Sequence, residues 1–427
     1  MKRKEMDWKG IFKWFYPGMK VKRWGLLVLL SAILFGFSIL LLVGRDWVGL
    51  VYNTLLSQPA YYYLAASLGL LAGVIGLIWG VNRVTHSITT VIKPPSRSTS
   101  DIIWQSRLLD KGVKVVAVGG GTGLSVLLRG LKKHTANITA IVTVMDDGGS
   151  SGRLRKEMNM LPPGDIRNCL IALADDESKM SRVFQHRFHD GAGLGGHSLG
   201  NLIIAGMEQI EGGFDLAIEE TSNLLNIRGR VVPSTLKNTH IVATLEGGKV
   251  VTGESSLHKH PERIERITLA EPAAPYSQAV EAIEGADVII LGPGSLYTSI
   301  IPNMLVDGIP EAIEGSPATK YYVTNVMTEP GETDGMSACD HLGALNSYIE
   351  VSCLDYGIVN TGDVDRDILV RYVEEGSGLV EADLGSDNKY GLKLIEGDLI
   401  ELVKLEGKQT VKHNHEHLAT LILDSCQ

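Results

Sequence analysis

The sequence predicts an α/β protein in which a doubly wound, mainly parallel sheet follows a two-helix transmembrane hairpin. Three observations support this prediction: runs of Val and Ile alternate with amphipathic segments, these runs end in glycine-rich loops, and two long uncharged stretches lie near the amino terminus. Unbroken apolar strands separated by helices are typical of parallel sheets that helices cover on both faces. A chain of 427 residues has room for that sheet and for a separate membrane unit.

The two uncharged stretches, residues 24–44 and 61–81, are predicted to be transmembrane helices. At 1.5 Å per residue, each is long enough for the roughly 30 Å of a bilayer core. Tyrosines open the second stretch and Trp79 stands near its end, as expected where rings lie among the headgroups. A cleavable signal peptide would have a shorter apolar region and a small-residue cleavage site, which we do not find. Residues 1–92 are therefore assigned to a membrane anchor.

The distribution of Lys and Arg predicts a two-span protein of the cell (inner) membrane with both ends in the cytoplasm. Eight basic residues precede the first stretch, only Arg45 lies between the two, and Arg83 follows the second. Basic segments stay on the cytoplasmic side of the membrane. Residues 93–110, rich in Pro and Ser, then form a linker, and residues 111–427 form the soluble domain.

The acidity of this domain argues against nucleic acid as a partner. The first 24 residues hold eight basic and two acidic groups, +6 in all, so a formal charge of −9 for the chain leaves −15 for the remainder. Such a domain is a poor match for a phosphate backbone, and an anionic ligand must be held by local groups. The four cysteines have no CxxC spacing, so we expect free thiols and no metal bound through them.

Within the domain, residues 113–121 are predicted to form the first strand, 124–134 a helix and 138–149 the second strand. Polar breaks in the middle of the chain separate helices, which are expected at 165–176, 181–188, 198–210 and 215–227.

A hairpin is predicted around Gly247 and Gly248. The helix-and-strand pattern returns over 277–295 and 320–335, and short strands with a final helix are expected beyond Tyr356. Ligands of open α/β sheets bind at the carboxyl ends of strands, so the loops that follow the strands are the candidate sites.

The first candidate is the turn Gly120, Gly121, Thr122, Gly123, between a strand and a helix. Backbone N–H groups of such a turn and the helix dipole can hold a phosphate. The turn fails the dinucleotide fingerprint, because Leu124 occupies the place of its last glycine, and it fails the P-loop pattern as well. A tight turn that needs small residues only for packing is the alternative.

The second candidate follows the next strand. Asp146 and Asp147 could hold a ribose hydroxyl or Mg²⁺, which typically takes one or two carboxylates plus phosphate oxygens. Ser150, Ser151 and Arg153 could hold an oxyanion beside them. The alternative is a solvated turn that caps a helix.

The third candidate comprises Pro163, Gly164, Asp165 and Asn168. Asp165 can cap a helix, whereas Arg167 in the first turn opposes the helix dipole. A cation in that position suggests either an external anion or a salt bridge with a neighbouring acid.

Further loops add polar groups. His197 could bind a phosphate or transfer a proton, and Asn201 follows it, although a lone histidine is more often structural. Later loops contribute Asn325 and the run Gly292, Pro293, Gly294, Ser295. His413, His415, Glu416 and His417 lack zinc-helix spacing apart from one i, i+4 pair, which favours a solvated helix start.

No serine stands in a Gly-x-Ser-x-Gly elbow and no cysteine has an evident histidine partner, so nucleophilic catalysis is not indicated. The loops instead carry backbone donors, hydroxyls and paired carboxylates, which suit the binding of phosphates or their transfer.

Six ordered motifs carry a resemblance to a known family: VVAVGGGTGLSVLLRGLK, DDGGSSGRLRKE, LPPGDIRNCLIALAD, GHSLGNL, LGPGSLYTSI and VTNVMTEPGETDG. Over residues 113–424 the sequence resembles the CofD-like family, and within it the gluconeogenesis factor branch. The resemblance implies a modified Rossmann-like sheet. By motif match, the nucleotide cleft would be lined by Gly120 to Gly123, Asp146, Asp147, Pro163 to Asp165, Asn168, His197, Asn201 and Gly292 to Ser295.

The resemblance implies two alternative functions. The gluconeogenesis factor branch is linked to growth on gluconeogenic carbon sources, to cell shape and cell-wall synthesis, and to binding of UDP-sugars such as UDP-N-acetylglucosamine. CofD-like 2-phospho-L-lactate transferases instead move a phospholactyl group from a guanosine-diphosphate-linked donor to the precursor of coenzyme F420, with Mg²⁺. We favour the regulator that binds a nucleotide sugar, with little or no turnover.

The transferase remains the alternative, with Mg²⁺ on Asp146 and Asp147 and with His197 assisting proton transfer. A nicotinamide oxidoreductase is disfavoured by the broken fingerprint. No tightly bound organic cofactor is expected, and a homodimer remains open. Members of the branch that the chain resembles are typically soluble, so the anchor is interpreted as an addition that holds the domain near wall synthesis.

Overall fold

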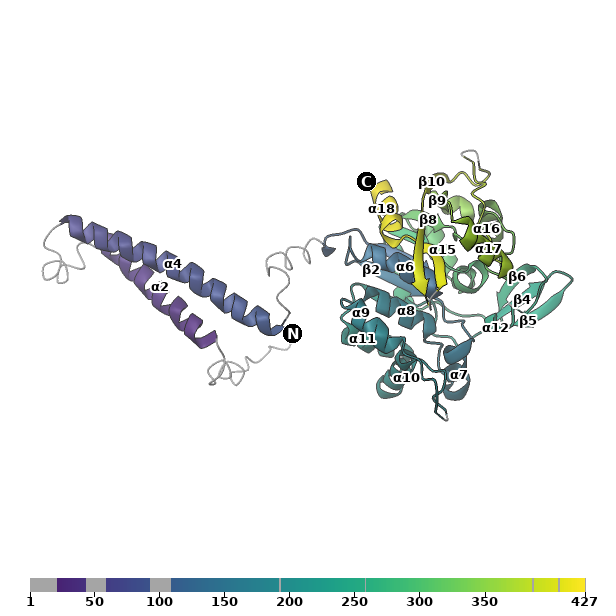
Figure 1. The fold of residues 1–427 in the computed structure, drawn as a ribbon, viewed down its shortest axis with the longest axis horizontal. Helices are drawn as coiled ribbons and strands as arrows, with labels where there is room; N and C mark the ends of the chain where they lie inside the picture. The colour runs from purple at the N-terminus through teal and green to yellow at the C-terminus, as the bar shows by residue number, and fades with distance from the viewer. Residues whose placement is uncertain are drawn as a thin grey trace. The chain divides into compact units, whose positions relative to one another are not determined.

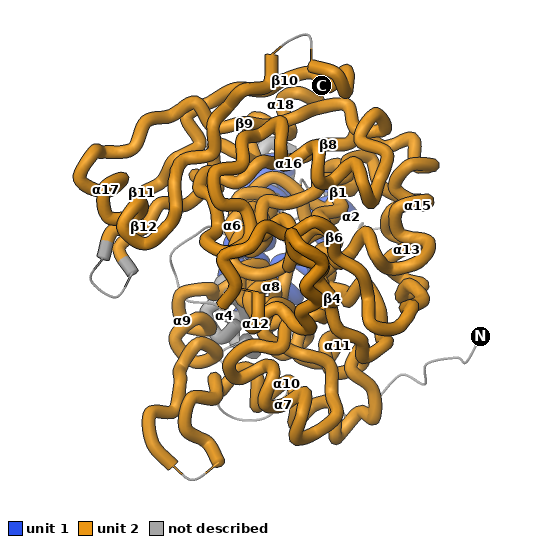
Figure 2. The backbone as a smooth tube through the Cα atoms, turned by 90° about the vertical axis from the view of Figure 1, so that its right-hand side faces the viewer, with its two compact units in different colours: residues 1–105 blue, residues 106–427 orange. Residues whose placement is uncertain are grey.

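The computed structural model describes residues 21–43, 59–92, 109–191, 193–257, 259–385, 388–405 and 408–426. The chain divides into two compact units, residues 1–105 and 106–427 (Figure 2). The basic residues before position 21, Arg45 and all but the last two residues of the predicted linker lie outside the described residues.

The first unit contains two helices, α2 (Val21–Val43) and α4 (Pro59–Ile92) (Figure 1). Within α4, residues Tyr63–Val84 form a helix long and apolar enough to cross a membrane by length and composition, and α2 contributes a shorter apolar stretch, Trp24–Leu40. Both predicted helices are therefore present, and α4 continues well beyond the predicted end at residue 81.

The contact between these helices is made by small residues of α4. A Cβ atom at Gly73 would lie 2.9 Å from the Cβ of Phe35, and one at Gly80 would lie 2.7 Å from a methyl group of Val28. Ser31 and Ser38 of α2 are buried in this contact. Small residues at four-residue spacing let helix backbones approach closely, as in membrane-spanning pairs.

The second unit is built on a seven-stranded sheet in the order β10-β9-β8-β7-β1-β2-β3. Every pairing in it is parallel, which confirms the predicted α/β class with a parallel sheet. Its strands are β1 (Val115–Gly119), β2 (Ile138–Val142), β3 (Arg230–Pro233), β7 (Val288–Leu291), β8 (Thr319–Val323), β9 (Tyr356–Asn360) and β10 (Lys393–Gly397).

Helices cover both faces of this sheet because side chains alternate along each strand. Val115 and Ala117 of β1 join one core, whereas Val116 and Val118 join the other. The first core includes α6 (Gly121–Leu131), α8 (Gly164–Leu173), α9 (Glu177–Phe184), α10 (Leu199–Glu211), α11 (Phe214–Leu225) and α18 (His415–Ser425). The second includes α13 (Ser277–Glu284), α14 (Ile301–Met304), α15 (Ile309–Gly315) and α16 (Ala338–Leu345).

Two small antiparallel sheets flank the central one. The first has the order β5-β4-β6, from β4 (Ile241–Leu245), β5 (Lys249–Thr252) and β6 (Ile264–Leu269). The hairpin predicted around Gly247 and Gly248 is confirmed by the pairing of β4 with β5. The second consists of β11 (Ile400–Leu405) and β12 (Lys408–His413).

Several elements were not predicted. Helix α7 (Gly149–Met158) occupies what the sequence suggests is a loop, β3 interrupts the helical middle, and α17 (Arg366–Glu374) lies in the tail. The prediction of a solvated helix start is wrong for His413, which ends β12 and is only 7 % exposed. Side chains alternate between the two faces of a strand, and in β12 this alternation turns the His413 side chain inward. The alternation is hard to recognise from the sequence, because the strand is short and mixes polar with apolar residues.

Candidate functional site

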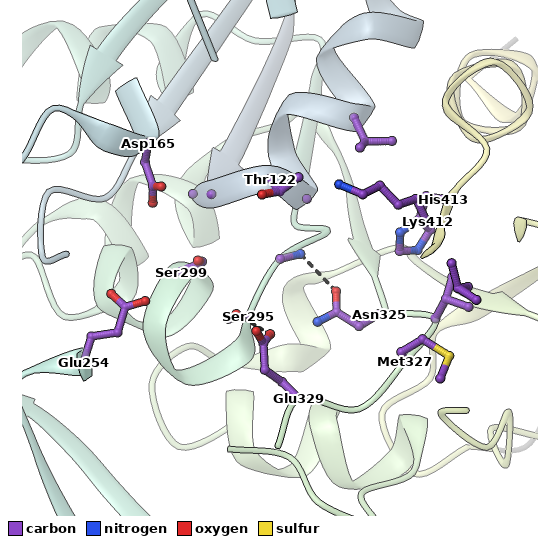
Figure 3. A pocket seen from close by; sticks show the side chains of 17 residues that line it. Thr122, Asp165, Glu254, Ser295, Ser299, Asn325, Met327, Glu329, Lys412 and His413 are labelled. Carbon is purple, nitrogen blue, oxygen red and sulfur yellow. Dashed lines mark hydrogen bonds between the residues drawn. The ribbon is translucent and has the colours of Figure 1, made fainter. Parts of the chain in front are cut away.

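A cleft of about 350 Å³ lies at the carboxyl ends of the parallel strands (Figure 3). The turn after β1, the loop after β7 and the segment after β8 meet there, and β12 closes one side. The residues that line the cleft are Gly120, Gly121, Thr122, Gly123, Val126, Asp165, Glu254, Gly294, Ser295, Ser299, Asn325, Val326, Met327, Glu329, Val411, Lys412 and His413.

The predicted glycine turn forms the start of α6 at the edge of this cleft. No side chain of the N-cap residue bonds to this helix; the Gly121 N–H donates to Asp165, and the amides of Thr122 and Gly123 remain available to a ligand. A Cβ atom at Gly123 would lie 2.5 Å from the carbonyl oxygen of Pro293 and 2.8 Å from the Cα of Gly294. Packing therefore demands glycine at this position, and the same close approach brings two loops to one edge of the cleft.

Hydrogen bonds fix the neighbouring loops to each other. The Gly294 N–H donates to Oδ1 of Asn325 at 3.0 Å, and the Ser295 hydroxyl donates to Glu329. Nδ2 of the buried Asn303 donates to the Gly119 carbonyl at 3.1 Å, which ties the end of β1 to the segment after β7. The cleft wall is thus a preformed polar surface.

One end of the cleft carries carboxyl groups. Burial, followed by the charge of Asp146, raises the pKa of Asp165 to about 7, although the Gly121 N–H donates to this carboxyl. Burial and nearby carboxylates, beginning with Asp146, raise the pKa of Glu254 to about 9. Behind them burial raises the pKa of Glu332 to about 8. Carboxyl groups that lie close together and are shielded from water cannot all be ionised at once, so part of this cluster is protonated at neutral pH.

The opposite side of the cleft carries Lys412 and His413 at the end of β12 (Figure 3). The Lys412 amine points toward Thr122 and makes no ion pair within the described part of the chain. Burial lowers the pKa of Lys412, and the charge of Arg129 lowers it further. Burial lowers the pKa of His413 to about 4, and its neutral ring donates from Nε2 to the Thr324 carbonyl at 3.1 Å. Val126, Val326, Met327 and Val411 add apolar surface.

Asp146 and Asp147 do not line the cleft, and their carboxylates face different elements. Oδ1 of Asp146 accepts from the Gly148 N–H at 2.7 Å. Oδ1 of Asp147 accepts from the Ser255 N–H at 2.8 Å and so holds α12 (Glu254–Leu257), the helix that carries Glu254. Among the residues that the structure describes, no three His, Cys, Asp or Glu side chains are grouped to hold a metal. Mg²⁺ stays a prediction, and it would need phosphate oxygens as further ligands.

Other predicted residues form a buried network next to the cleft. Ser150 lies 3.0 Å from Nδ1 of His197 and accepts from Nδ2 of Asn201 at 3.1 Å. Arg167 donates to Ser198, to Oδ1 of Asn201 at 2.7 Å and to Asn168 at 3.0 Å. Burial lowers the pKa of Arg167 to about 10.

Arg167 forms no ion pair within the described ranges, and its Nε has no partner there. Of the two alternatives considered for this cation, a direct salt bridge does not match that arrangement, and an external anion stays a prediction. Ser151 and Arg153 lie on α7, and Arg153 donates to the Gly195 carbonyl at 2.8 Å. Pro163 and Gly164 begin α8, and Gly292 and Pro293 lead into the loop at the cleft.

The structure thus brings together the predicted residues Gly120 to Gly123, Asp165, Gly294, Ser295 and Asn325 at one cleft. Sequence reasoning missed Glu254, Ser299, Glu329, Lys412 and His413. The loop pattern offered a signal for Ser299 and Glu329, because both follow buried strands. Glu254 follows one of the small sheets and Lys412 lies in the other. No sequence motif indicates that these sheets lie next to the cleft.

An open parallel sheet with a polar cleft at the carboxyl ends of its strands defines a Rossmann-like α/β protein of the doubly wound class. The sequence model described as 2-phospho-L-lactate transferase CofD matches residues 115–400. The chain belongs to the CofD family, and its curated relatives place it in the gluconeogenesis factor branch.

The gluconeogenesis factor of Bacillus subtilis is 46 % identical over 73 % of this chain and 97 % of its own length. A crystal structure of a Bacillus halodurans protein has a TM-score of 0.70 and 46 % identity, and covers 73 % of this chain and all of its own. A gluconeogenesis-factor relative from Nostoc is 42 % identical over 96 % of this chain and 92 % of its own length. The amino-terminal unit is therefore shared with that relative and is not an addition peculiar to this chain.

Proposed function

We propose that this protein is a regulator that binds a UDP-sugar, UDP-N-acetylglucosamine in particular, and that acts in cell-wall synthesis, cell shape and growth on gluconeogenic carbon sources. The observation that carries the proposal is the cleft in which the uncapped amino terminus of α6 and the amine of Lys412 face each other. An amide-lined helix start opposed by a cation without a carboxylate partner suits a diphosphate.

The rest of the cleft supports a nucleotide. Val126, Val326, Met327 and Val411 offer an apolar surface for a base on the Lys412 side. The neutral His413 offers Nδ1, which has no partner among the described residues, as an acceptor. A small-molecule site usually combines apolar surface with a few fixed polar groups, and this cleft offers both.

A binding function without turnover is supported by the lack of a cysteine nucleophile among the described residues that line the cleft. None of the four cysteines lines it, and burial holds the pKa of Cys169 well above its ordinary value. A thiol in that state is a poor nucleophile.

The test is calorimetric titration of the full-length protein in lipid nanodiscs with UDP-N-acetylglucosamine and with GDP, with and without Mg²⁺. Tight binding of the UDP-sugar with no product supports the proposal. Replacing Lys412 with Met is expected to weaken binding roughly tenfold or more, since an interaction with a charged group contributes about 1.5–3 kcal/mol. Lys412→Arg should retain most of the affinity. Lys133→Met, which removes an exposed partner of Glu416, is the matched control.

A phosphoryl-linked group transfer is the second candidate, favoured by the family description and by the raised pKa of Asp165. A carboxyl group that titrates near neutral pH can donate or accept a proton during transfer. In this alternative Asp146 and Asp147 would hold Mg²⁺, which would offset the negative charge of the ligand phosphates, and His197 would assist proton transfer. Asp147→Asn should then abolish release of nucleotide from the donor, while unchanged release would count against the transferase.

We also propose that α2 and α4 span the cell membrane as a hairpin, with the domain in the cytoplasm. Their outward side chains are apolar, as Leu29, Leu68 and Leu71 are each more than half exposed, whereas Ser31 and Ser38 are buried. A water-soluble helix pair has the opposite distribution, with apolar side chains in the contact and polar side chains outside. Extraction of membranes at alkaline pH is expected to leave the full chain in the pellet, and its release into the supernatant would refute spanning.

A further inference from the structure

Ser299 is a buried hydroxyl that faces the cleft without a partner. It is 7 % exposed, and its Oγ makes no hydrogen bond within the described residues. A Cβ atom at Gly120 would lie 3.3 Å from this Oγ and 2.7 Å from Oδ2 of Asp165. The two oxygens therefore lie against the same point of the glycine turn. The Ser299 hydroxyl is therefore open to the cleft and can donate to and accept from a ligand group at this point.

Glu254 reaches the same end of the cleft from a different part of the fold. Helix α12 carries it, and Asp147 holds that helix through the Ser255 N–H. The Glu254 carboxyl has no hydrogen-bond partner in the described part of the chain. Figure 3 shows Asp165, Glu254 and Ser299 on one side of the cleft, and Lys412 and His413 on the other.

These three side chains offer acceptors and hydroxyl-type donors, and no cation. Sugar hydroxyls can satisfy such groups, because each hydroxyl donates once and accepts twice. A carboxylate on the sugar would instead be repelled by Asp165, which ionises above its pKa of about 7, whereas Glu254, with a pKa of about 9, stays protonated and offers a hydroxyl-type donor.

We propose that Asp165, Glu254 and Ser299 form the subsite for the sugar of the nucleotide-sugar ligand, and that this subsite accepts uncharged, hydroxyl-rich sugars and rejects acidic ones. The proposal rests on the proposed function and extends it to ligand orientation. With the diphosphate at α6 and Lys412, the base lies toward β12 and the sugar lies toward α12.

The experiment compares UDP, UDP-glucose and UDP-glucuronate by calorimetric titration of the full-length protein in nanodiscs, in the presence of EDTA. UDP-glucuronate differs from UDP-glucose by a carboxylate in place of a hydroxymethyl group. We expect UDP-glucose to bind roughly tenfold more tightly than UDP-glucuronate, since one repulsive contact between partly buried charges is worth on the order of 1.4 kcal/mol.

Asp165→Asn keeps the shape and, in titrations at pH 8, removes the charge, so we expect the ratio of the two affinities to fall to about threefold or less. Ser299→Ala should weaken binding of UDP-glucose more than binding of UDP, because UDP has no sugar beyond the diphosphate. Glu208→Gln is the control, since Glu208 is a partly buried acid on α10 outside the cleft, with its pKa raised by burial. It should leave the ratio unchanged.

The outcomes separate the two proposals. Failure of UDP and both UDP-sugars to bind would overturn the proposed function and the subsite with it. Binding of UDP with equal affinity for the two sugars, or an unchanged ratio in folded Asp165→Asn at pH 8, would overturn the subsite alone. A preference for UDP-glucose that arises only when Mg²⁺ replaces EDTA would assign these carboxyls to a cation and would also overturn it.

Discussion

The domain contains two polar clusters that differ in how the hydrogen bonds of their side chains are satisfied. In the network around Arg167, the side chains of Ser150, His197 and Asn201 bond to one another. In the cleft, Ser299 and Glu254 have no partner among the described residues. The comparison teaches that a glycine- and serine-rich motif does not itself identify a ligand site; unsatisfied groups at a cavity do.

The largest expected effect is a loss of stability when the hydrogen-bond network around Arg167 is broken. Arg167→Met removes three hydrogen bonds and leaves Oδ1 of the buried Asn201 and Oδ1 of the half-buried Asn168 without this donor, whereas Ser198 keeps the bond from the Asn201 N–H. We expect a loss on the order of 4 kcal/mol in the free energy of unfolding, because each orphaned buried group costs about 1–3 kcal/mol. Chemical denaturation measures it, with the exposed Arg182→Met as control. A loss as small as that of the control would remove the structural role assigned to the network.

A second prediction concerns the contact that joins the two loops of the cleft. Gly123→Ala places a methyl group against the backbone of Pro293 and Gly294, which cannot move aside as a flexible side chain would. We expect the free energy of unfolding to fall by roughly 2–3 kcal/mol and ligand affinity to fall with it. Gly206→Ala in α10 is the matched control, as nothing lies within 4 Å of the added atom. There a gain of about 0.5–1 kcal/mol is expected.

In the cleft, removing a charge is expected to stabilise the fold. The folded state raises the pKa of Asp165 from 3.8 to about 7. Between these values the unfolded chain releases the proton and the folded one keeps it, so stability falls as pH rises through this window and then levels off. Asp165→Asn should therefore gain on the order of 2 kcal/mol at pH 8 and little at pH 4.

Thermal unfolding of both proteins between pH 4 and pH 8 measures this difference. An equal loss of stability at every pH would show that Asp165 belongs with the network residues, not with the ligand-facing ones.

The smallest effect is expected for Ser150→Ala. His197 and Asn201 each lose one neutral hydrogen bond, which is worth about 1 kcal/mol. Because Ser150 does not line the cleft, affinity for the UDP-sugar should be unchanged. Denaturation and titration of the same variant check both statements, and a selective loss of affinity would show that the network belongs to the binding site.

The strength of the strand pattern decided how much of the fold could be predicted. Runs such as Val115 to Gly119 and Val288 to Leu291 are buried on both faces, so their composition alone indicates a parallel sheet. Helix α7 was missed because glycine and serine at its start are poor helix formers, and tertiary contacts hold it instead. Only part of the site could be predicted. Glu254 follows β5 and Lys412 lies in β12, and long-range packing brings the small sheets of these two strands to the cleft.

The position of β12 in the chain has a consequence for biosynthesis. The residues that complete the cleft, Lys412 and His413, come after the end of the family match at residue 400, whereas α2 and α4 come first. Segments fold in the order in which they leave the ribosome. If α2 and α4 span the membrane and the cleft binds a ligand, as we propose, the hairpin can enter the membrane while the cleft still lacks a wall. A newly made chain would then reach the membrane before it can bind its ligand, and a product truncated before residue 412 would be anchored but unable to respond.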